Sequence, residues 1–169
     1  STLSATLNYT APGGGLVTQP FVAIGSYLAS SLGVIDVPSG AGTVAVLNGD
    51  IVFCYTVVNP ASGTVTFSKQ SGTATIGSFS TQITRTGSAG KGILSTVPVT
   101  GDGTLQIRST RNGTPVSTTA IIVVYRGATV VGQSTTGAGT SGTDITLTLV
   151  TQDTNSWCVI CGHSEVTTT

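Results

Sequence analysis

Short runs of Val, Ile, Thr and aromatic residues recur along the chain, separated by clusters of Gly, Asn, Asp, Pro and Ser. Runs of this kind with turn residues between them are typical of the strands of a sandwich or barrel. Helix signals are nearly absent, because Gly, Thr or Val interrupts each stretch where apolar residues could recur at helical spacing. The pattern therefore predicts an all-β fold, an antiparallel β-sandwich of the jelly-roll type.

The best-defined runs also place the strands and the turns between them. Asn48-Gly49-Asp50, Gly101-Asp102-Gly103 and Asn112-Gly113 supply residues that adopt positive φ, so tight hairpins are expected at these three places. Strands are predicted at residues 43–47, 51–58, 64–68, 79–86, 92–99, 104–109, 118–126, 144–150 and 157–162.

Two of these runs predict how side chains are distributed between the core and the surface. Apolar residues alternate in 104–108, so Leu105 and Ile107 should face the core, while Gln106 and Arg108 face water or a neighbour. The run 120–125 is apolar on both faces. It is expected to be a central strand covered on each side, or a strand that lies under a subunit contact.

The first forty residues differ from the rest of the chain. We expect residues 1–40 to form amino-terminal strands or an arm and residues 41–169 the sandwich, together one compact domain. Residues 11–15 form a flexible break, and a mostly apolar segment follows between two prolines. That segment supplies either the first strands of the sandwich or an extended arm that pairs with a sheet edge of an adjacent subunit. Its candidate interaction residues are Phe21, Ile24 and Tyr27.

Charge is scarce in this chain of 169 residues. Asp, Glu, Lys and Arg make up 7%, against about 25% in a typical soluble domain, and six residues of each sign give a formal net charge of zero. A surface with so little charge tends to associate with other surfaces, which predicts a homo-oligomer. The balanced charge excludes the basic footprint needed for nucleic acid or an anionic membrane, and no apolar stretch approaches the ~20 residues of a membrane helix.

The amino-terminal residues and the cysteines bear on where the protein works. Residues 1–9 lack the basic and apolar regions of a signal peptide, so the chain is either already processed or never secreted by that route. Three cysteines form an odd set, which is simplest to interpret as thiols in a reducing cytoplasm.

Cys158, Cys161 and His163 invite a zinc hypothesis, with Cys54 as a fourth ligand. However, residues 158 and 161 of an extended strand point to opposite faces and cannot share one ion. We therefore predict no metal site, and interpret Cys54 and Cys158 as small buried hydrophobic residues.

No other pattern predicts catalysis. His163 is the sole histidine, no Gly-x-Ser-x-Gly elbow accompanies it, and the carboxylates are scattered singly beside turn residues. The glycine runs lack the Lys-Ser/Thr step of a phosphate-binding loop. The sequence thus predicts no enzyme and no cofactor.

Trp157, the only tryptophan, begins the last predicted strand. It is either a core residue or a platform on which a sugar ring stacks. We include it among the candidate interaction residues, since the second alternative would make a glycan the ligand.

The order of features from Gly33 onward resembles the β-sandwich virion structural proteins of tailed bacteriophages and some bacterial surface proteins. The matching pieces are Asn48-Gly49-Asp50 leading into Ile51-Val52-Phe53, the run Ile121 to Gly127, a Thr/Gly-rich loop, and Thr154-Asn155-Ser156-Trp157. The resemblance implies a structural role in a particle, as a capsid decoration (cement) protein, head fibre or tail component, with no chemistry of its own.

This resemblance gives the leading functional expectation. The chain would form a symmetric oligomer, such as a trimer, and contact the major capsid or tail protein in a virion assembled in the host cytoplasm. Its uncharged amino terminus favours the outside of the particle, because capsid proteins that enclose a genome usually carry a basic arm. The alternatives are a secreted adhesin or carbohydrate-binding module at the cell surface, and a filament subunit that donates its amino-terminal strand.

Overall fold

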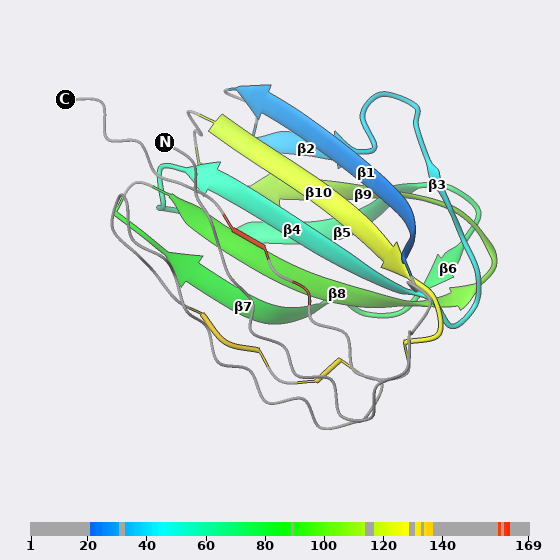
Figure 1. The fold of residues 1–169 in the computed structure, drawn as a ribbon. Coiled ribbons are helices and arrows are strands. Elements are labelled where there is room, and N and C mark those ends of the chain that lie inside the picture. Colours follow the sequence, from blue (N-terminus) through cyan, green and yellow to red (C-terminus); the bar gives the residue numbers. More distant parts are fainter. Residues whose placement is uncertain are drawn as a thin grey trace.

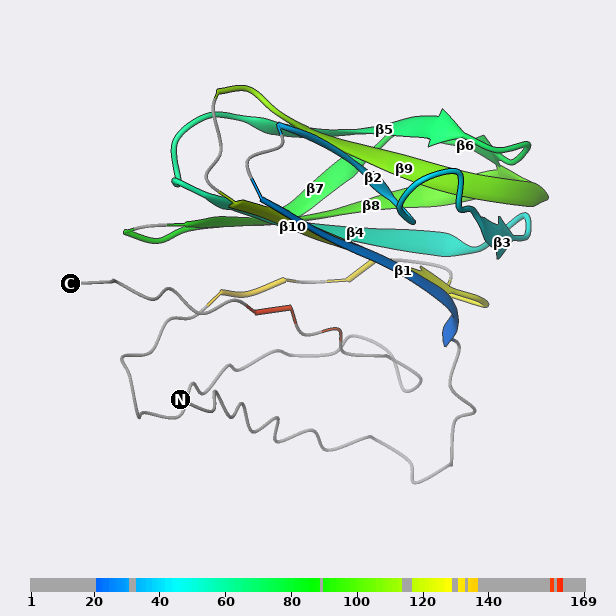
Figure 2. The same ribbon diagram turned by 90° about the horizontal axis from the view of Figure 1, so that it is seen from above.

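The structure, a computed structural model, describes residues 21–30, 33–88, 90–113, 117–128, 131–132, 134–136, 159 and 161–162. Its regular elements are all strands, and two antiparallel sheets pack face to face (Figures 1 and 2). The predicted antiparallel β-sandwich is therefore confirmed.

The first sheet contains the longest strands. Its order is β1 (Phe21–Ser30), β10 (Ser117–Tyr125), β4 (Ile51–Asn59) and β8 (Lys91–Gly101). Two further strands, β7 (Ser80–Thr86) and β6 (Thr75–Ile76), pair with successive parts of β8. The prediction that 120–125 is a central strand holds, since β10 lies between β1 and β4.

The second sheet is built around β9 (Gly103–Arg111). Successive parts of β9 pair with β2 (Val34–Val37) and β3 (Val44–Val46), while β5 (Val65–Ser71) pairs with residues 106–111. β4 and β10 are therefore central strands of one layer, and β9 is the central strand of the other. Figure 2 shows the two layers edge-on.

The core lies between the two sheets and follows the alternation of the strands. Leu105 and Ile107 are buried as predicted, at 0% and 1% exposure, and face Val52, Ile122 and other aliphatic residues of the first sheet. A polar contact between described residues crosses this core. The Thr56 hydroxyl of β4 donates a buried hydrogen bond of 3.0 Å to the Ser109 hydroxyl of β9.

The predicted turns exist, but their role differs from the expectation. Gly49, Gly103 and Gly113 do have positive φ, of 89°, 152° and 109°. However, each turn joins strands of different sheets, so the expected hairpins at these places are wrong. Turn residues fix the local backbone, whereas the pairing partner is set by which apolar faces must be buried. The hairpin that the described chain does form joins β7 to β8, where the Gly87 amide donates to the Gly90 carbonyl at 2.8 Å.

The amino-terminal segment is described from Phe21 onward. Over residues 21–30 it pairs with β10 of the same chain, as a first strand of the sandwich would. Residues 1–20 and the predicted strand 144–150 lie outside the described residues, as do residues 157, 158 and 160 of the predicted strand 157–162. Residues 159, 161 and 162 are described and belong to no strand.

Candidate functional site

The predicted interaction residues fall on two very different parts of the chain. Phe21, Ile24 and Tyr27 occupy β1, in register with Tyr125, Val123 and Ala120 of β10. Trp157 lies outside the described residues. The structure thus places three of the four on one edge strand of the first sheet, and the carbohydrate hypothesis that rests on Trp157 stays a prediction.

The two thiols within the described residues, Cys54 and Cys161, lie on opposite sides of the first sheet. Cys54 is a buried core residue with a free thiol, and its burial raises its pKa. Cys161 is also free, and burial raises its pKa to about 11. No group of three or more His, Cys, Asp or Glu residues within the described ranges could hold a metal ion, and Cys158 and His163 lie outside those ranges. In the same part of the chain, no helix is long and apolar enough to cross a membrane.

The outer face of the first sheet, turned away from the second sheet, is apolar. In β4 and β10 the core residues alternate with half-buried side chains that point outward. Two of them, Phe53 and Tyr125, meet edge to face with ring centroids 5.2 Å apart. The apolar members of this face are Phe53, Tyr55, Val57, Ile121, Val123 and Tyr125.

Described pieces of the chain beyond β10 lie over this outer face. Burial raises the pKa of Tyr55 to about 12, and the nearby Cys161 contributes to that shift and to the raised pKa of Tyr125. The Ser134 hydroxyl donates a hydrogen bond of 2.9 Å to the Gln82 carbonyl of β7. Both views place these pieces outside the first sheet (Figures 1 and 2). The described residues near Cys161 therefore lie close to Tyr55 and Tyr125 of the apolar outer face.

The strand edge at β5 has a different chemistry. Within the described residues β5 pairs with β9 alone, so its other edge carries no strand. Its exposed side chains are Thr66, Ser68, Lys69, Gln70 and Ser71. We call these five residues the hydroxyl-rich edge. Proteins usually protect such an edge with several charges, a proline or a covering loop, whereas this edge has one lysine, whose ammonium is held by the Ala74 carbonyl at 2.5 Å.

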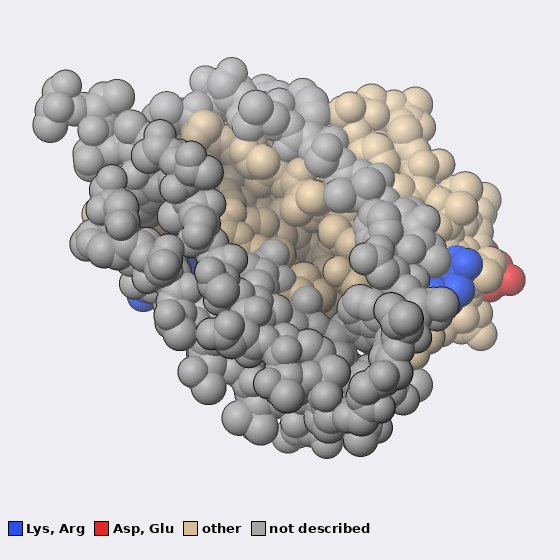
Figure 3. Space-filling view, in the orientation of Figure 1, with Lys and Arg blue, Asp and Glu red and all other residues tan. Residues whose placement is uncertain are grey.

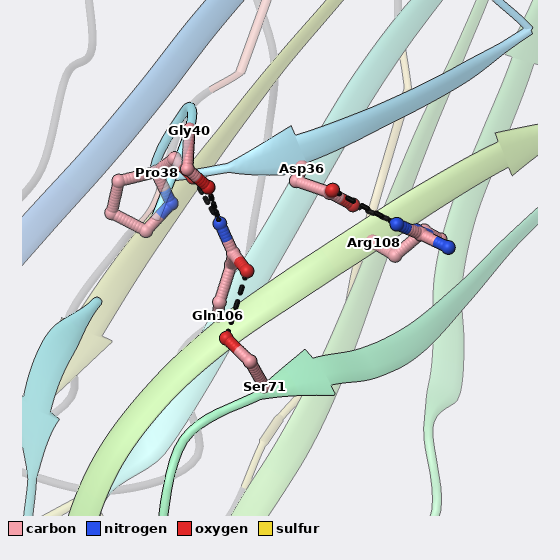
Figure 4. Close-up of polar contacts among 6 residues, drawn as sticks. All are labelled: Asp36, Pro38, Gly40, Ser71, Gln106 and Arg108. Carbon is pink, nitrogen blue, oxygen red and sulfur yellow. Dashed lines mark hydrogen bonds and ion pairs between the residues drawn. The ribbon is translucent and has the colours of Figure 1, made fainter. Parts of the chain in front are cut away.

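Next to this edge, Gln106 is buried on the outer side of the second sheet (Figure 4). Its amide donates hydrogen bonds to the Pro38 and Gly40 carbonyls at 2.8 and 2.7 Å, and its carbonyl accepts one from the Ser71 hydroxyl at 2.8 Å. Of the two predicted surroundings, water or a neighbour, Gln106 has the second, because the turn after β2 folds over it. The sequence had no signal for this, since alternation assigns a face but not what covers it.

The neighbouring Arg108 does point outward and is paired. Its guanidinium binds both carboxylate oxygens of Asp36 on β2, at 2.7 and 2.9 Å (Figure 4). The hydrogen bond from Arg108 lowers the pKa of the Asp36 carboxyl. The pair joins adjacent strands, and its two opposite charges neutralise each other within the subunit.

The remaining charges gather near the ends of the strands. At one end, Arg126 binds the buried Asp50, and Asp102 accepts a hydrogen bond from the Asn48 amide. At the other end lie Lys91 and Arg111, which both bind carbonyls of the Ser62–Gly63 turn. Figure 3 shows blue and red atoms together at the first end, blue atoms without red at the other, and tan atoms between them. The middle of the described surface in this view is thus neutral.

In comparisons with known proteins, no family model, no curated protein and no solved structure matches the chain.

Proposed function

We propose that the protein is a non-enzymatic structural subunit of a virus particle, an external component such as a capsid decoration protein, head fibre or tail component of a tailed bacteriophage. The observation that carries this proposal is the hydroxyl-rich edge on β5. An unprotected edge of this kind fits a protein that adds strands or neighbouring subunits to itself.

The distribution of charge supports the same role. Asp36–Arg108 and Asp50–Arg126 neutralise each other within the subunit, so that broad surfaces carry hydroxyl and aliphatic groups. Such surfaces pack against a neighbour with few charges to desolvate. Function then resides in contacts between subunits, through backbone hydrogen bonds and small side chains.

Electron microscopy of the native source material, with gold-labelled antibody against the protein, tests the role in a particle. We expect the label on the outer surface of capsids or tails. A label confined to cell surfaces would favour an adhesin and overturn the proposal.

The contribution of the edge is tested by lysine substitutions. Thr66→Lys with Ser68→Lys places charges along β5 and should weaken oligomer formation and binding to particles, measured by light scattering after size exclusion and by co-sedimentation. Ser39→Lys, in an exposed turn, is the matched control and should behave as the wild type. Equal assembly by both variants would contradict a role for this edge.

A further inference from the structure

Two Asn-Gly dipeptides occur in the chain, Asn48-Gly49 before β4 and Asn112-Gly113 after β9. An asparagine that precedes glycine is prone to lose its side-chain amide. Glycine has no side chain to hinder attack of its backbone nitrogen on the amide carbon of the preceding residue. All four residues are exposed, so exposure does not distinguish the two dipeptides. The hydrogen bonds of their backbones do.

The Asn48-Gly49 turn is held at the nitrogen that would react and at the residue that would be attacked. The Gly49 amide donates a hydrogen bond of 2.9 Å to the Val99 carbonyl. The Asn48 amide donates one of 2.6 Å to the carboxylate of Asp102. Attack of the Gly49 nitrogen on the Asn48 side chain would break the first of these bonds and disturb the second, so the turn resists the reaction.

The Asn112-Gly113 turn is held differently. The Asn112 amide donates a hydrogen bond of 2.9 Å to the Thr64 carbonyl, which fixes the turn on its amino-terminal side. None of the described residues accepts a hydrogen bond from the Gly113 amide. The reaction needs the attacking nitrogen to come to about 3–3.5 Å from the amide carbon. At this turn the approach costs no backbone hydrogen bond between described residues.

We propose that Asn112 is a site of spontaneous deamidation, and that the fold protects Asn48 from the same reaction. The Gly113 nitrogen forms a bond to Cγ of Asn112, the Cγ–Nδ2 bond breaks, and the proton of the Gly113 amide leaves with the Nδ2 group as ammonia. One water molecule then opens the five-membered succinimide at either of its carbonyls, which gives aspartate or isoaspartate. The net reaction consumes one water and releases one ammonia.

The reaction places a new carboxylate beside two cations. Arg111 precedes Asn112 in the chain, and its Nη2 lies 4.0 Å from the position that a Cβ of Gly113 would take. The Lys91 ammonium binds the carbonyl of Gly63, a residue whose Cα lies against the Asn112 carbonyl. Neither cation forms an ion pair with a carboxylate of the described residues. Deamidation therefore adds a counter-charge near both cations.

The isoaspartate product also changes the backbone. It brings the Cβ of residue 112 into the main chain, directly after the amide that Thr64 holds. The link between β9 and β10 becomes one atom longer. The aged protein is therefore expected to contain two products that carry the same charge and differ in their backbone.

Ageing of the full chain at mildly alkaline pH, followed by tryptic digestion and mass spectrometry, tests the proposal. Trypsin releases residues 112–126, in which Asn112 is the only Asn or Gln, and residues 1–69, which contain Asn48. In the folded protein Asn112 should deamidate at least about 10-fold faster than Asn48. An isoaspartyl methyltransferase should methylate the aged 112–126 peptide. A sample digested without incubation corrects for changes during digestion.

Unfolding and substitution provide the controls. In guanidinium chloride the hydrogen bond of Gly49 is lost, so the two asparagines should react at similar rates. Asn112→Gln should remove the change from residues 112–126, because glutamine closes the corresponding six-membered ring far more slowly. Asn48→Gln, in the protected turn, is the matched variant and should age as the wild type does. Circular dichroism melts verify that both variants are folded.

Similar rates at the two asparagines of the folded protein, or a faster reaction at Asn48, would overturn the proposal. It would also fail if Asn112 stayed unchanged while a synthetic peptide of residues 109–116 deamidated. Neither result bears on assembly at the hydroxyl-rich edge, which both variants leave unaltered.

Discussion

The carboxylate of Asp50 accepts two hydrogen bonds from Arg126, at 3.0 and 3.1 Å, across 76 positions of sequence. Asp50 precedes β4 and Arg126 follows β10, so the pair closes one end of the two central strands. The Asp50 side chain is 1% exposed and also accepts a hydrogen bond from the Leu47 amide at 2.8 Å. One buried carboxylate therefore connects the turn before β4 to the end of β10.

The substitution Asp50→Asn is expected to lower the free energy of unfolding by about 1–3 kcal/mol. The neutral amide of Asn accepts fewer hydrogen bonds from Leu47 and Arg126 than the buried carboxylate does. Urea denaturation followed by circular dichroism measures the change. Asp102→Asn is the control, since Asp102 is exposed and accepts a single hydrogen bond from the Asn48 amide. Equal losses at both positions would show that burial of Asp50 adds nothing.

The Asp36–Arg108 pair predicts a specific dependence of stability on pH. The hydrogen bond from Arg108 lowers the pKa of Asp36 in the folded state below its ordinary value of 3.8. The carboxylate therefore contributes stability that is present above the unfolded pKa and lost as the pH falls through the folded pKa.

The difference in unfolding free energy between the wild type and Asp36→Asn should be constant from about pH 5 to 8 and vanish at the acid end. Urea denaturation series across this range measure it. A difference that instead grew as the pH fell would contradict the direction of the shift.

Gly72 is required by a close approach of two backbones. Its φ is +103°, and a methyl group at its Cα would overlap the carbonyl oxygen of Thr104 in β9. Gly49 has a similar φ of +89° but open space around it. Gly49→Ala should cost about 1–2 kcal/mol from backbone strain, and Gly72→Ala at least about 2 kcal/mol more, because β5 must also move away from β9. Thermal melts of the two variants compare them directly, and equal costs would exclude the steric contribution.

The thiols should differ in reactivity. In a Cys158→Ser background, labelling of Cys161 by iodoacetamide at neutral pH should be roughly 100-fold slower than that of an unperturbed thiol, because its pKa is raised from 9.0 to about 11. The rate should rise about tenfold per pH unit up to about pH 11. Cys54, which is 0% exposed, should react after denaturation. Mass spectrometry of the labelled peptides measures both, and rapid labelling of Cys54 in the folded protein would contradict its position in the core.

The strands were predictable where alternation or β-branched runs marked them. The run 51–58 matches β4, 118–126 matches β10 within one residue, and Leu105 and Ile107 face the core. The short strands β2 and β6, with four and two residues, carry too few alternating positions to be predicted. The pairing of strands was not predictable from the turns, since β8 and β9 follow each other in sequence but belong to different sheets.

The candidate surfaces were less predictable than the fold. The scarcity of charge was evident from composition, but the pairing of Asp50 with Arg126 depends on two distant strands meeting. The unpaired Nη1 of Arg111 likewise depends on the turn after β4, which the sequence did not place beside β9. The Asp50–Arg126 pair and the unpaired Nη1 of Arg111 can be recognised in the folded structure, because both depend on which strands and turns pack around these side chains.

The antiparallel pairing of β1 with β10 also bears on the timing of folding. Phe21 is in register with Tyr125, and Val34 of β2 with Thr110 of β9, so early residues pair with partners synthesised much later. Contacts so distant in sequence slow folding, because long loops must close before any pairing stabilises them. On the ribosome, the first strand must therefore wait without its neighbour until Tyr125 has left the exit tunnel, and chaperones that shield an unpaired apolar strand would act in that interval.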